Sequence, residues 1–414
     1  MDVKIAIDKP VASAAIKITG SKSETNRLLL LQALYPQIQI ENRSESDDSE
    51  AMQKALASNS DVIDIHHAGT AMRFLTAYFA QKEGRSVLLT GSQRMKERPI
   101  GVLVEALRSL GADISYTENE GYPPLKINGK KLSGGKTAIQ ADVSSQYITA
   151  LLLIAPKLEN GLELILEGEL TSVPYIKMTL GLLQEAGFVT SFTNNIIKIQ
   201  PTANNQKPTT IIVESDWSSA SYFYSIVALS PEGTAITLSS YKKDSLQGDS
   251  ALAEIYKDFG VVSTYKDDTI TLTKINTELS TVNCQLNNTP DIAQTIAVTC
   301  FGLGIGCHLT GLHTLKIKET DRLEALKTEL SKFGAEIAVT EDSLSLKPHN
   351  LFSEGSYCET KIEVATYNDH RMAMSFTPLA IKTCLIVKDS GVVSKSFPTF
   401  WKNMHQLGFS VDEV

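Results

Sequence analysis

A repeat of about 74 residues constrains the fold of this chain more than any other feature of its sequence. Five short helical patterns end in an apolar residue followed by glycine, and these glycines recur every 73 to 76 residues, at Gly111, Gly187, Gly260, Gly334 and Gly408. At 11, 8, 4 and 1 positions before the glycines, eighteen of the twenty residues are apolar. This spacing predicts five amphipathic helices, each with one buried face and a C-terminal glycine.

A second kind of helical segment alternates with the first and is apolar on nearly every side. Six such segments begin near residues 22, 69, 145, 217, 291 and 369. Helices without a polar face belong in a core, so we predict six repeats, each with a buried helix, a surface helix and several short strands. The first surface helix lies around "SDDSEAMQKALA". The first two buried helices are 47 residues apart, against 72 to 78 for the others, so the first repeat should lack about one β-hairpin.

Six repeats of this size predict an α/β (or α+β) chain of two domains with three repeats each. The polar stretch "TANNQKPTT", followed by "IIVESDWSSASYF", is a suitable place for the passage between the halves. We expect this crossover near Glu214.

Charge and composition exclude several classes of partner. The 414 residues have a formal net charge of −8, which disfavours general binding of nucleic acid or an anionic membrane, so an anionic ligand needs a local cluster of lysine and arginine. No apolar run is long enough to span a membrane, and the N-terminus has no apolar signal core. The five cysteines form no CxxC pair, which predicts a reducing compartment and no zinc knuckle. We therefore expect a cytoplasmic protein.

Polar residues of the buried helices gather in their first turns, where unpaired N–H groups and the helix dipole favour anions. These residues are Lys22, Ser23, Arg27, Gly69, Thr70, Arg73, Ser144, Ser145, Gln146, Asp291, Asp369, His370 and Arg371. The surface helices add charged motifs at "RMKERPIG", "SVPY", "KETDR" and "SKSFP". If the helix starts face a common space, they predict a site for a multiply charged ligand.

Each of these residues also has a simpler interpretation. Ser144 and Asp291 can cap helices, Arg98 can be a solvated loop residue, and "KETDR" can be an ordinary charged helix start. His66 and His67 could suggest a metal pair, but without a clear carboxylate or cysteine partner a structural role is favoured. Arg371 is harder to explain in this way, because a buried arginine needs an anionic partner. The recurrence of such residues at the same place in successive repeats favours a site.

Seven motifs, in chain order, resemble those of the 5-enolpyruvylshikimate 3-phosphate (EPSP) synthases: "GSKSETNR", "AGTAMR", "RMKERPIG", "SSQY", "KETDRL", "NDHRMAM" and "KSFPTF". The resemblance covers the whole chain. It implies two domains of three βαβαββ units, an inverse α/β barrel, with residues 1–20 and 214–414 in one domain and 21–213 in the other. It also implies transfer of the enolpyruvyl group of phosphoenolpyruvate to the 5-hydroxyl of shikimate 3-phosphate, without metal or organic cofactor.

The resemblance assigns a role to each motif. The residues implied for phosphoenolpyruvate are Lys22, Gly69, Arg98, Gln146 and Lys395 around its phosphate, and Arg322 and Arg371 for its carboxylate. The residues implied for shikimate 3-phosphate are Ser23 and Arg27 at the carboxylate, Ser144, Ser145, Ser172 and Tyr175 at the 3-phosphate, Asp291 and Lys318 at the reacting hydroxyl, and Lys22 and Gln146 between both substrates. The implied catalytic residues are Lys22, Asp291 as base and Glu319 as acid.

Two other functions remain open. The related enolpyruvyl transferase that acts on UDP-N-acetylglucosamine typically carries a cysteine acid in its first half, but no cysteine precedes Cys284 here. A noncatalytic relative that binds a phosphorylated metabolite would not need Lys22, Asp291, Glu319 and Lys395 together. Two positions depart from the family: His67 and Thr314 stand where asparagine is usual. We expect a monomer that acts on small molecules alone.

Overall fold

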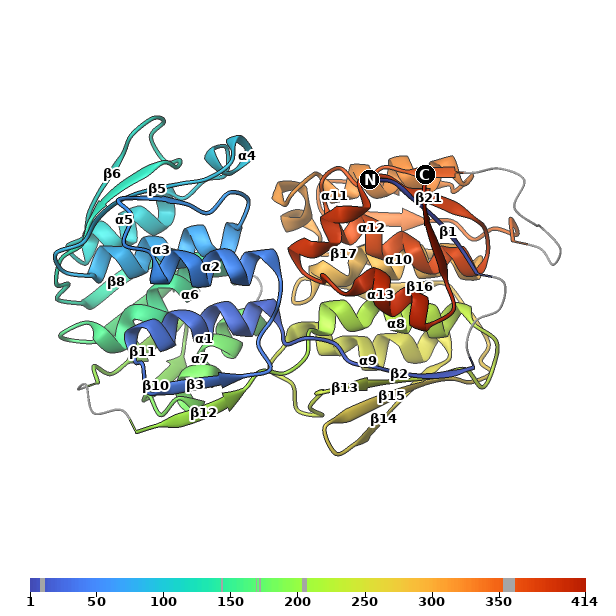
Figure 1. The fold of residues 1–414 in the computed structure, drawn as a ribbon, viewed down its shortest axis with the longest axis horizontal. Coiled ribbons are helices and arrows are strands. Elements are labelled where there is room, and N and C mark those ends of the chain that lie inside the picture. Colours follow the sequence, from blue (N-terminus) through green and yellow to red (C-terminus); the bar gives the residue numbers. More distant parts are fainter. Residues whose placement is uncertain (8–11, 143, 169, 171–172, 203–206, 353–361) are drawn as a thin grey trace. The chain divides into compact units, whose positions relative to one another are not determined.

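The chain folds into two compact units. The structure is a computed structural model that describes residues 1–7, 12–142, 144–168, 170, 173–202, 207–352 and 362–414. Unit 1 comprises Met1–Thr19 and Glu214–Val414, and unit 2 comprises Gly20–Val213. Each unit has its own hydrophobic core (Figure 1). From the sequence we expected the domain boundaries at 20/21 and 213/214.

Three buried helices form the centre of each unit, as their apolar sequences predict. In unit 2 they are α1 (Lys22–Leu34), α3 (Gly69–Gln81) and α6 (Ser145–Ile154). In unit 1 they are α8 (Trp217–Leu229), α10 (Ala293–Leu303) and α12 (His370–Phe376). Four of these begin at the predicted residue, and α10 and α12 begin two and one residues later. The 3-10 helices η4 (Pro290–Ile292) and η6 (Thr377–Ile381) adjoin α10 and α12.

The surface helices alternate with the buried ones. They are α2 (Asp47–Ala57), α5 (Gly101–Ser109), α7 (Val173–Glu185), α9 (Leu252–Ile255), α11 (Arg322–Lys332) and α13 (Phe400–Gln406), with the short α4 (Gln93–Lys96) before α5. Helix α9 is flanked by the 3-10 helices η2 (Gly248–Ala251) and η3 (Tyr256–Phe259). All five repeat glycines have positive φ, between 72° and 99°, so each ends its helix in the left-handed conformation that glycine adopts readily.

Five four-stranded sheets repeat one pattern, in which a parallel pair is followed by two antiparallel pairs. The first sheet of unit 1 has the strand order β20 (Ile362–Val364), β21 (Leu385–Val387), β1 (Val3–Ala6), β22 (Ser410–Glu413). The second has the order β2 (Ser13–Ile16), β13 (Ala235–Ser239), β15 (Thr269–Lys274), β14 (Val261–Lys266). The third has the order β16 (Val282–Gln285), β17 (Cys307–Thr310), β19 (Ser343–Leu346), β18 (Ile337–Val339). In unit 2 they are β8 (Gly135–Gln140), β9 (Leu162–Glu167), β11 (Ile196–Ile199), β10 (Thr190–Thr193); and β4 (Val62–Asp64), β5 (Ser86–Thr90), β7 (Leu125–Asn128), β6 (Asp113–Tyr116).

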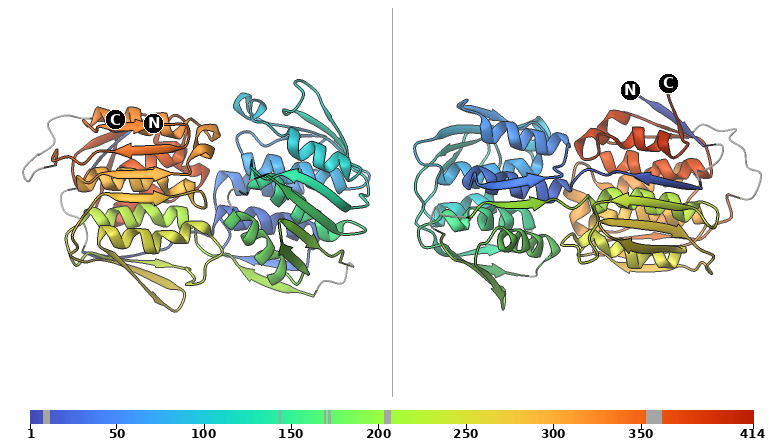
Figure 2. Two further views of the ribbon diagram at one scale, coloured as in Figure 1. Left: turned by 180° about the vertical axis from the view of Figure 1, so that it is seen from behind. Right: turned by 60° about the horizontal axis from the view of Figure 1, so that its bottom comes forward.

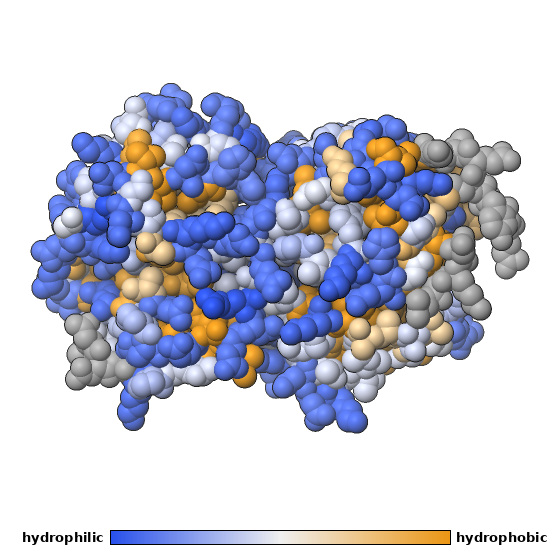
Figure 3. Space-filling view, in the orientation of Figure 1, coloured by the Kyte–Doolittle hydropathy of each residue, from blue (hydrophilic) through white to orange (hydrophobic). Residues whose placement is uncertain are grey.

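The sixth sheet is smaller and explains the short first repeat. It pairs β12 (Thr209–Ile212) with β3 (Ile38–Glu41) in parallel, and among the described residues it has no antiparallel hairpin. This is the hairpin that the helix spacing predicted to be absent. In each unit the sheets lie outside the buried helices (Figure 2), which confirms the predicted α/β class. Hydrophilic residues cover most of the face shown in Figure 3.

The N-terminal segment belongs to unit 1, where β1 pairs with β21 and β22 and β2 pairs with β13. The chain then enters unit 2 at Gly20. A Cβ atom there would lie 1.8 Å from the carbonyl oxygen of Asn42, so only glycine fits. The Asn42 side chain donates to the carbonyl of Val213 at 2.8 Å, which ties the two ends of unit 2 together.

The structure bears on two further expectations, one about the cysteines and one about membrane-spanning helices. Cys284, Cys300 and Cys307 are free thiols, as expected, but Cys384 is disulfide-bonded, so the expectation of reduced cysteines is wrong for that residue. Among the described residues, no helix has both the length and the apolar character needed to cross a membrane.

Candidate active site

The first turns of α1, α3 and α6 lie at the same end of unit 2. Gln146 at the start of α6 donates from Nε2 to Thr70 Oγ1 in the first turn of α3 at 3.3 Å. One turn further on, Arg27 of α1 donates from Nη2 to Thr149 Oγ1 of α6 at 3.3 Å. The helices are therefore parallel, and their N-terminal ends, which favour anions, are grouped together.

The loop after β5 adds Arg98 to this end of unit 2. The carbonyl of Pro99 accepts hydrogen bonds from Tyr147 Oη at 2.6 Å and from Arg73 Nη2 at 3.0 Å, which fixes the loop against α6 and α3. A Cβ atom at Gly69 would lie only 2.6 Å from Arg98 Nη1. Gly69 therefore allows the Arg98 guanidinium to lie directly against the start of α3.

Arg27 and Arg73 are buried and held by neutral acceptors. Arg27 donates from Nε to Thr179 Oγ1 at 2.8 Å and from Nη1 to the carbonyl of Ser23 at 2.7 Å, and Arg73 donates to two carbonyls at 3.0 and 3.2 Å. Within the described residues, no ion pair joins either arginine to a carboxylate. Burial lowers the pKa of both to about 10, and the charge of Arg98 adds to this effect at Arg73. A nearby anion would stabilise both charges.

The other residues predicted for unit 2 occupy the same helix starts. Lys22 begins α1, and its Nζ lies 3.6 Å from Asp48 Oδ2. Ser144 caps α6 by accepting a hydrogen bond from the backbone N–H of Gln146 at 3.3 Å, which confirms the capping interpretation, and Ser145 is the first residue of α6. A cap does not exclude a ligand contact, so the binding roles of these residues stay predictions.

The predicted shikimate 3-phosphate residues near α7 are only partly described. Arg27 also donates to the carbonyl of Tyr175 at 3.4 Å, which joins α1 to the first turn of α7. Because Arg27 is 3% exposed and its donors already have acceptors, direct contact with a carboxylate requires some of these bonds to exchange. Ser172 lies outside the described residues.

The two adjacent histidines shape the turn that leads into α3. Their Nδ1 atoms are 2.8 Å apart, and the rings meet edge to face. His66 has a left-handed φ of 48°, and its backbone N–H donates to Asp64 Oδ1 at 2.7 Å. Within the described part of the chain, no group of three or more histidine, cysteine, aspartate or glutamate residues could hold a metal ion. His66 and His67 therefore hydrogen-bond to each other at this turn.

In unit 1, three carboxylates surround Arg322, the first residue of α11. Its Nε donates to Asp369 Oδ2 at 2.6 Å, its Nη1 to Asp291 Oδ1 at 2.8 Å and its Nη2 to Glu319 Oε2 at 2.9 Å. Burial lowers the pKa of Arg322, but these carboxylates outweigh burial and raise it above its ordinary value. Arg322 thus joins the starts of α10, α11 and α12, which are labelled in Figure 1.

Two more cations adjoin the same carboxylates. Arg371 Nη2 lies 3.4 Å from Asp291 Oδ2, and Lys318 Nζ lies 3.6 Å from Asp291 Oδ1. Asp369 also caps α12 by accepting a hydrogen bond from the backbone N–H of Arg371 at 2.8 Å. The group called the Arg322 cluster below consists of Asp291, Lys318, Glu319, Arg322, Asp369 and Arg371. It contains three cations and three carboxylates, all of them close to helix starts.

Asp291 serves this cluster rather than a helix cap. It lies in η4, and the cap position of α10 falls on Ile292, which makes no side-chain cap bond. The capping interpretation of Asp291 is therefore wrong. At the start of α11 the cap is Asp321, whose Oδ1 accepts hydrogen bonds from two backbone N–H groups at 3.1 and 3.2 Å.

The remaining unit 1 predictions lie outside the cluster. Lys395 Nζ donates to the carbonyl and Oδ1 of Asn368, at 2.6 and 2.8 Å, just before Asp369. Thr314 lies in η5 (His313–Ile317), and its buried hydroxyl has no hydrogen-bond partner among the described residues. Thr314, which stands where asparagine is usual, thus carries a hydroxyl that no described residue of unit 1 hydrogen-bonds.

The carboxylate of Asp249 lies beside the cluster but belongs to none of the seven sequence motifs. Asp249 is buried and accepts hydrogen bonds from the hydroxyls of Ser218 and Thr289, the latter at 2.6 Å. Burial and then the charge of Asp291 raise the pKa of Asp249. The sequence did mark Asp249 as unusual, because Asp249 and Thr179 are the two polar residues at the otherwise apolar positions before the repeat glycines. Thr179 binds Arg27, so both exceptions support the candidate site.

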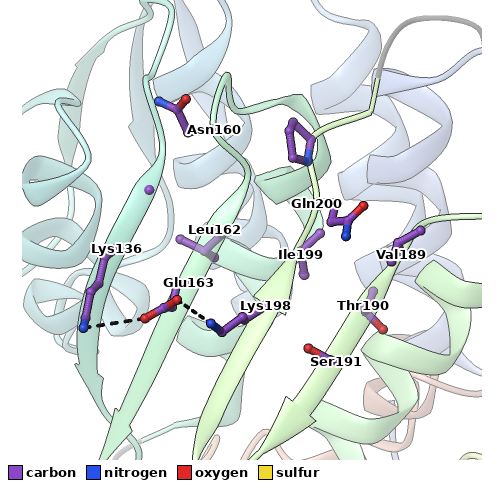
Figure 4. A pocket seen from close by; sticks show the side chains of 12 residues that line it. Lys136, Asn160, Leu162, Glu163, Val189, Thr190, Ser191, Lys198, Ile199 and Gln200 are labelled. Carbon is purple, nitrogen blue, oxygen red and sulfur yellow. Dashed lines mark ion pairs between the residues drawn. The ribbon is translucent and has the colours of Figure 1, made fainter.

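A separate hollow on unit 2 does not fit this chemistry. It lies on the outer face of the sheet formed by β8, β9, β11 and β10 (Figure 4). Its cations, Lys136 and Lys198, both pair with Glu163, at 3.6 and 2.8 Å, so this carboxylate offsets part of their charge. None of the residues predicted for substrates lines this hollow.

Solved structures with the same architecture define the class of fold. An EPSP synthase structure from Acinetobacter baumannii superposes with a TM-score of 0.81 and 20% sequence identity over 100% of both chains. The enolpyruvyl transferase NikO from Streptomyces tendae superposes with a TM-score of 0.73 and 13% identity, over 99% of this chain and 98% of that one. The fold is therefore that of the enolpyruvyl transferases.

Sequence comparison identifies the family. The family model for EPSP synthase (3-phosphoshikimate 1-carboxyvinyltransferase) matches residues 53–404. The 3-phosphoshikimate 1-carboxyvinyltransferase of Bacteroides fragilis is 45% identical over 96% of both chains, and that of Haemophilus influenzae is 37% identical over 95% of this chain and 96% of its own. The chain belongs to the EPSP synthase family. The family and enzyme class predicted from the sequence are thereby confirmed.

Proposed function

We propose that this chain transfers the enolpyruvyl group of phosphoenolpyruvate to the 5-hydroxyl of shikimate 3-phosphate, with release of phosphate, through a tetrahedral intermediate. Family membership supports the reaction. The Arg322 cluster carries the assignment of residues, because it combines cations that can hold an anionic substrate with carboxylates that can exchange protons. From the sequence we also expect a cytoplasmic monomer.

Unit 2 supplies phosphate binding in this proposal. Lys22, Arg98 and Gln146 stand at grouped helix starts of unit 2 and take the phosphate of phosphoenolpyruvate, a role that the sequence also predicts for Lys395. The close approach of Arg98 to Gly69 supports this role, because a guanidinium beside a helix N-terminus increases the positive potential there. Ser144, Ser145, Ser172 and Tyr175 take the 3-phosphate of the second substrate, while Ser23 and Arg27 take its carboxylate.

Unit 1 supplies the carboxylate site and the base. Arg322, Arg371 and Lys318 all lie within ion-pair distance of the Asp291 carboxylate, so a substrate anion that binds some of these cations makes this carboxylate available to the reacting hydroxyl. We infer that the carboxylate of phosphoenolpyruvate does so by binding Arg371 and Arg322. Asp291 is then available to the 5-hydroxyl, which Lys318 also contacts. Substrate binding thus activates the base.

The proton transfers follow from the chemistry of an enol phosphate. Glu319 donates a proton to the methylene carbon of phosphoenolpyruvate, so that the neighbouring carbon becomes electrophilic and the 5-oxygen bonds to it as Asp291 accepts the hydroxyl proton. In the second step the C–O bond to phosphate breaks, the proton held by Asp291 leaves with the phosphate, a methyl proton returns to Glu319, and the double bond is restored. Lys22 stabilises the negative charge of the departing phosphate.

The direct test is phosphate release from phosphoenolpyruvate with shikimate 3-phosphate as acceptor, compared with UDP-N-acetylglucosamine at the same concentration. We expect turnover only with shikimate 3-phosphate. Turnover with the nucleotide sugar would favour the related transferase. Calorimetric binding of both proposed substrates without phosphate release would instead identify a noncatalytic relative.

A further inference from the structure

The turn before α12 has a backbone that needs support. Tyr367 and Asn368 both have left-handed φ angles, 52° and 59°, and the N–H of Asp369 donates to the carbonyl of Thr366 at 2.8 Å. Residues 366–369 thus have the positive φ angles and closing hydrogen bond of a type I′ turn. Asparagine tolerates this conformation, but a bulky tyrosine rarely adopts it. The turn also carries Asp369 of the Arg322 cluster, so its position matters for the candidate site.

Glu329 holds this turn from α11. Its side chain is completely buried, and its Oε1 accepts a hydrogen bond from Tyr367 Oη at 2.6 Å. Its Oε2 accepts hydrogen bonds from the backbone N–H of Ala365 at 3.1 Å and from Lys332 Nζ at 2.6 Å. Burial and the hydrogen bond to Glu329 raise the pKa of Tyr367 to about 12, so the hydroxyl remains a donor at neutral pH.

Helix α11 therefore contacts the turn at two places. Arg322, its first residue, binds Asp369 at the end of the turn, while Glu329, two helical turns later on the same face, binds Tyr367 and the residue before the turn. A third contact comes from Lys395, whose Nζ binds Asn368. Two of these three supporting side chains, Arg322 and Lys395, are ones that the proposed function assigns to phosphoenolpyruvate.

We propose that Glu329 is a positioning residue for the Arg322 cluster. It fixes the turn of residues 366–369 against α11, and the turn fixes Asp369 and the backbone of Arg371. Without Glu329, the strained turn would leave this geometry and carry the two residues with it. The ligand named here, the phosphoenolpyruvate carboxylate, rests on the proposed function, whereas the effect of Glu329 on the turn does not.

Two variants test the kinetic consequence. Tyr367→Phe removes only the hydroxyl of a residue that is 39% exposed, and Glu329→Gln keeps the shape of the buried side chain. We expect the KM for phosphoenolpyruvate to rise about threefold in Tyr367→Phe and about tenfold in Glu329→Gln, with the KM for shikimate 3-phosphate within about twofold of wild type. The double variant should be no worse than Glu329→Gln, because Tyr367 supports the turn only through residue 329, where glutamine leaves one acceptor oxygen for three donors.

Glu324→Gln is the matched control, because Glu324 lies on the exposed side of α11 and pairs only loosely with Lys327, at 3.5 Å. It should change neither KM. If the Glu329 and Tyr367 variants lower the melting temperature but leave both KM values unchanged, or raise both equally, Glu329 is structural only and the proposal is overturned.

Hydrogen exchange gives a second readout that does not depend on activity. In both variants the backbone amides of residues 366–376 should exchange faster than in wild type and in Glu324→Gln, while those of α10 keep their rates. Unchanged exchange in 366–376 would overturn the positioning role. A wild-type protein without phosphate release would overturn the proposed function instead, and the exchange measurement would still decide the role of Glu329.

Discussion

In unit 2 the buried arginines of the candidate site are held by hydroxyl and carbonyl groups, whereas in unit 1 Arg322 is held by three carboxylates. Burial accordingly lowers the pKa of Arg27 and Arg73, while the carboxylates raise that of Arg322. The first arrangement keeps its positive charge for an incoming anion. The second is nearly neutral and contains groups that can exchange protons. The two units are built from the same repeats, yet one suits phosphate binding and the other acid–base chemistry.

The largest effect should come from the proton-transferring side of this comparison. Asp291→Asn keeps the shape of the side chain and cannot accept the hydroxyl proton, so we expect kcat for phosphate release to fall about 10²- to 10⁴-fold. Calorimetry should still show shikimate 3-phosphate binding, because the residues predicted to bind its 3-phosphate belong to unit 2. A kcat within about threefold of wild type would remove Asp291 from the chemistry and leave it as a partner of arginines.

Replacing one buried arginine in each unit should lower the free energy of unfolding by different amounts, because the two arginines have different partners. Arg322→Met leaves the buried Asp369 without its main cation, which should lower the free energy of unfolding by roughly 3–5 kcal/mol. Arg73→Met leaves only neutral acceptors unpaired and should lower it by roughly 1–3 kcal/mol. Urea unfolding measures both. Equal losses would mean that the two environments do not differ as their partners suggest.

Arg98→Ala tests the anion-binding side. Loss of a charge-assisted contact should weaken phosphoenolpyruvate binding by about 1.5–3 kcal/mol and leave shikimate 3-phosphate binding nearly unchanged. The control is Arg94→Ala in the neighbouring helix α4, where Arg94 is exposed and pairs with Glu97 at 3.2 Å. Calorimetry with each ligand compares them. If both variants weaken binding alike, the effect is general electrostatics rather than a contact of Arg98.

The smallest effect should come from Gly69→Ala, which adds a methyl group where Arg98 Nη1 would lie 2.6 Å away. We expect the displaced guanidinium to raise the KM for phosphoenolpyruvate by about fivefold, equivalent to roughly 1 kcal/mol. Gly391→Ala is the control, because no atom lies within 4 Å of its added Cβ. In an Arg98→Ala background the Gly69 substitution should add little, and an undiminished effect there would show that the methyl acts on something else.

Sequence periodicity was enough to predict the architecture. The buried helices, the terminal glycines and the missing hairpin all follow from local apolar spacing, which depends little on tertiary contacts. The partners of the charged residues could not be predicted from this spacing. Asp291 looked like a cap because it precedes an apolar helix, but its partners Arg322 and Arg371 lie 31 and 80 positions later. Only the fold brings such residues together.

Arg27 and Arg371 also show that the sequence does not reveal the partners of charged residues. Arg27 and Arg371 both stand near starts of buried helices, and the sequence marks both as anion ligands. The structure gives Arg27 hydroxyls of α6 and α7 and carbonyls of α1 and α7, so it also joins three helices. Glu329 is the reverse case, because a glutamate within a surface helix carries no signal until its burial against the turn is seen.

Strands β1 and β2 pair with strands that lie more than two hundred residues later in the sequence, and this separation bears on how a newly made chain reaches its native state. Unit 2 is continuous and can complete its fold while the ribosome is still producing the rest. Strands β1 and β2 must wait for β13, β21 and β22 before their backbone groups find partners. Contacts this distant close slowly. Strands β1 and β2 are therefore exposed to mispairing during synthesis, and the sheet that contains β1 can be completed only after β22 has been made.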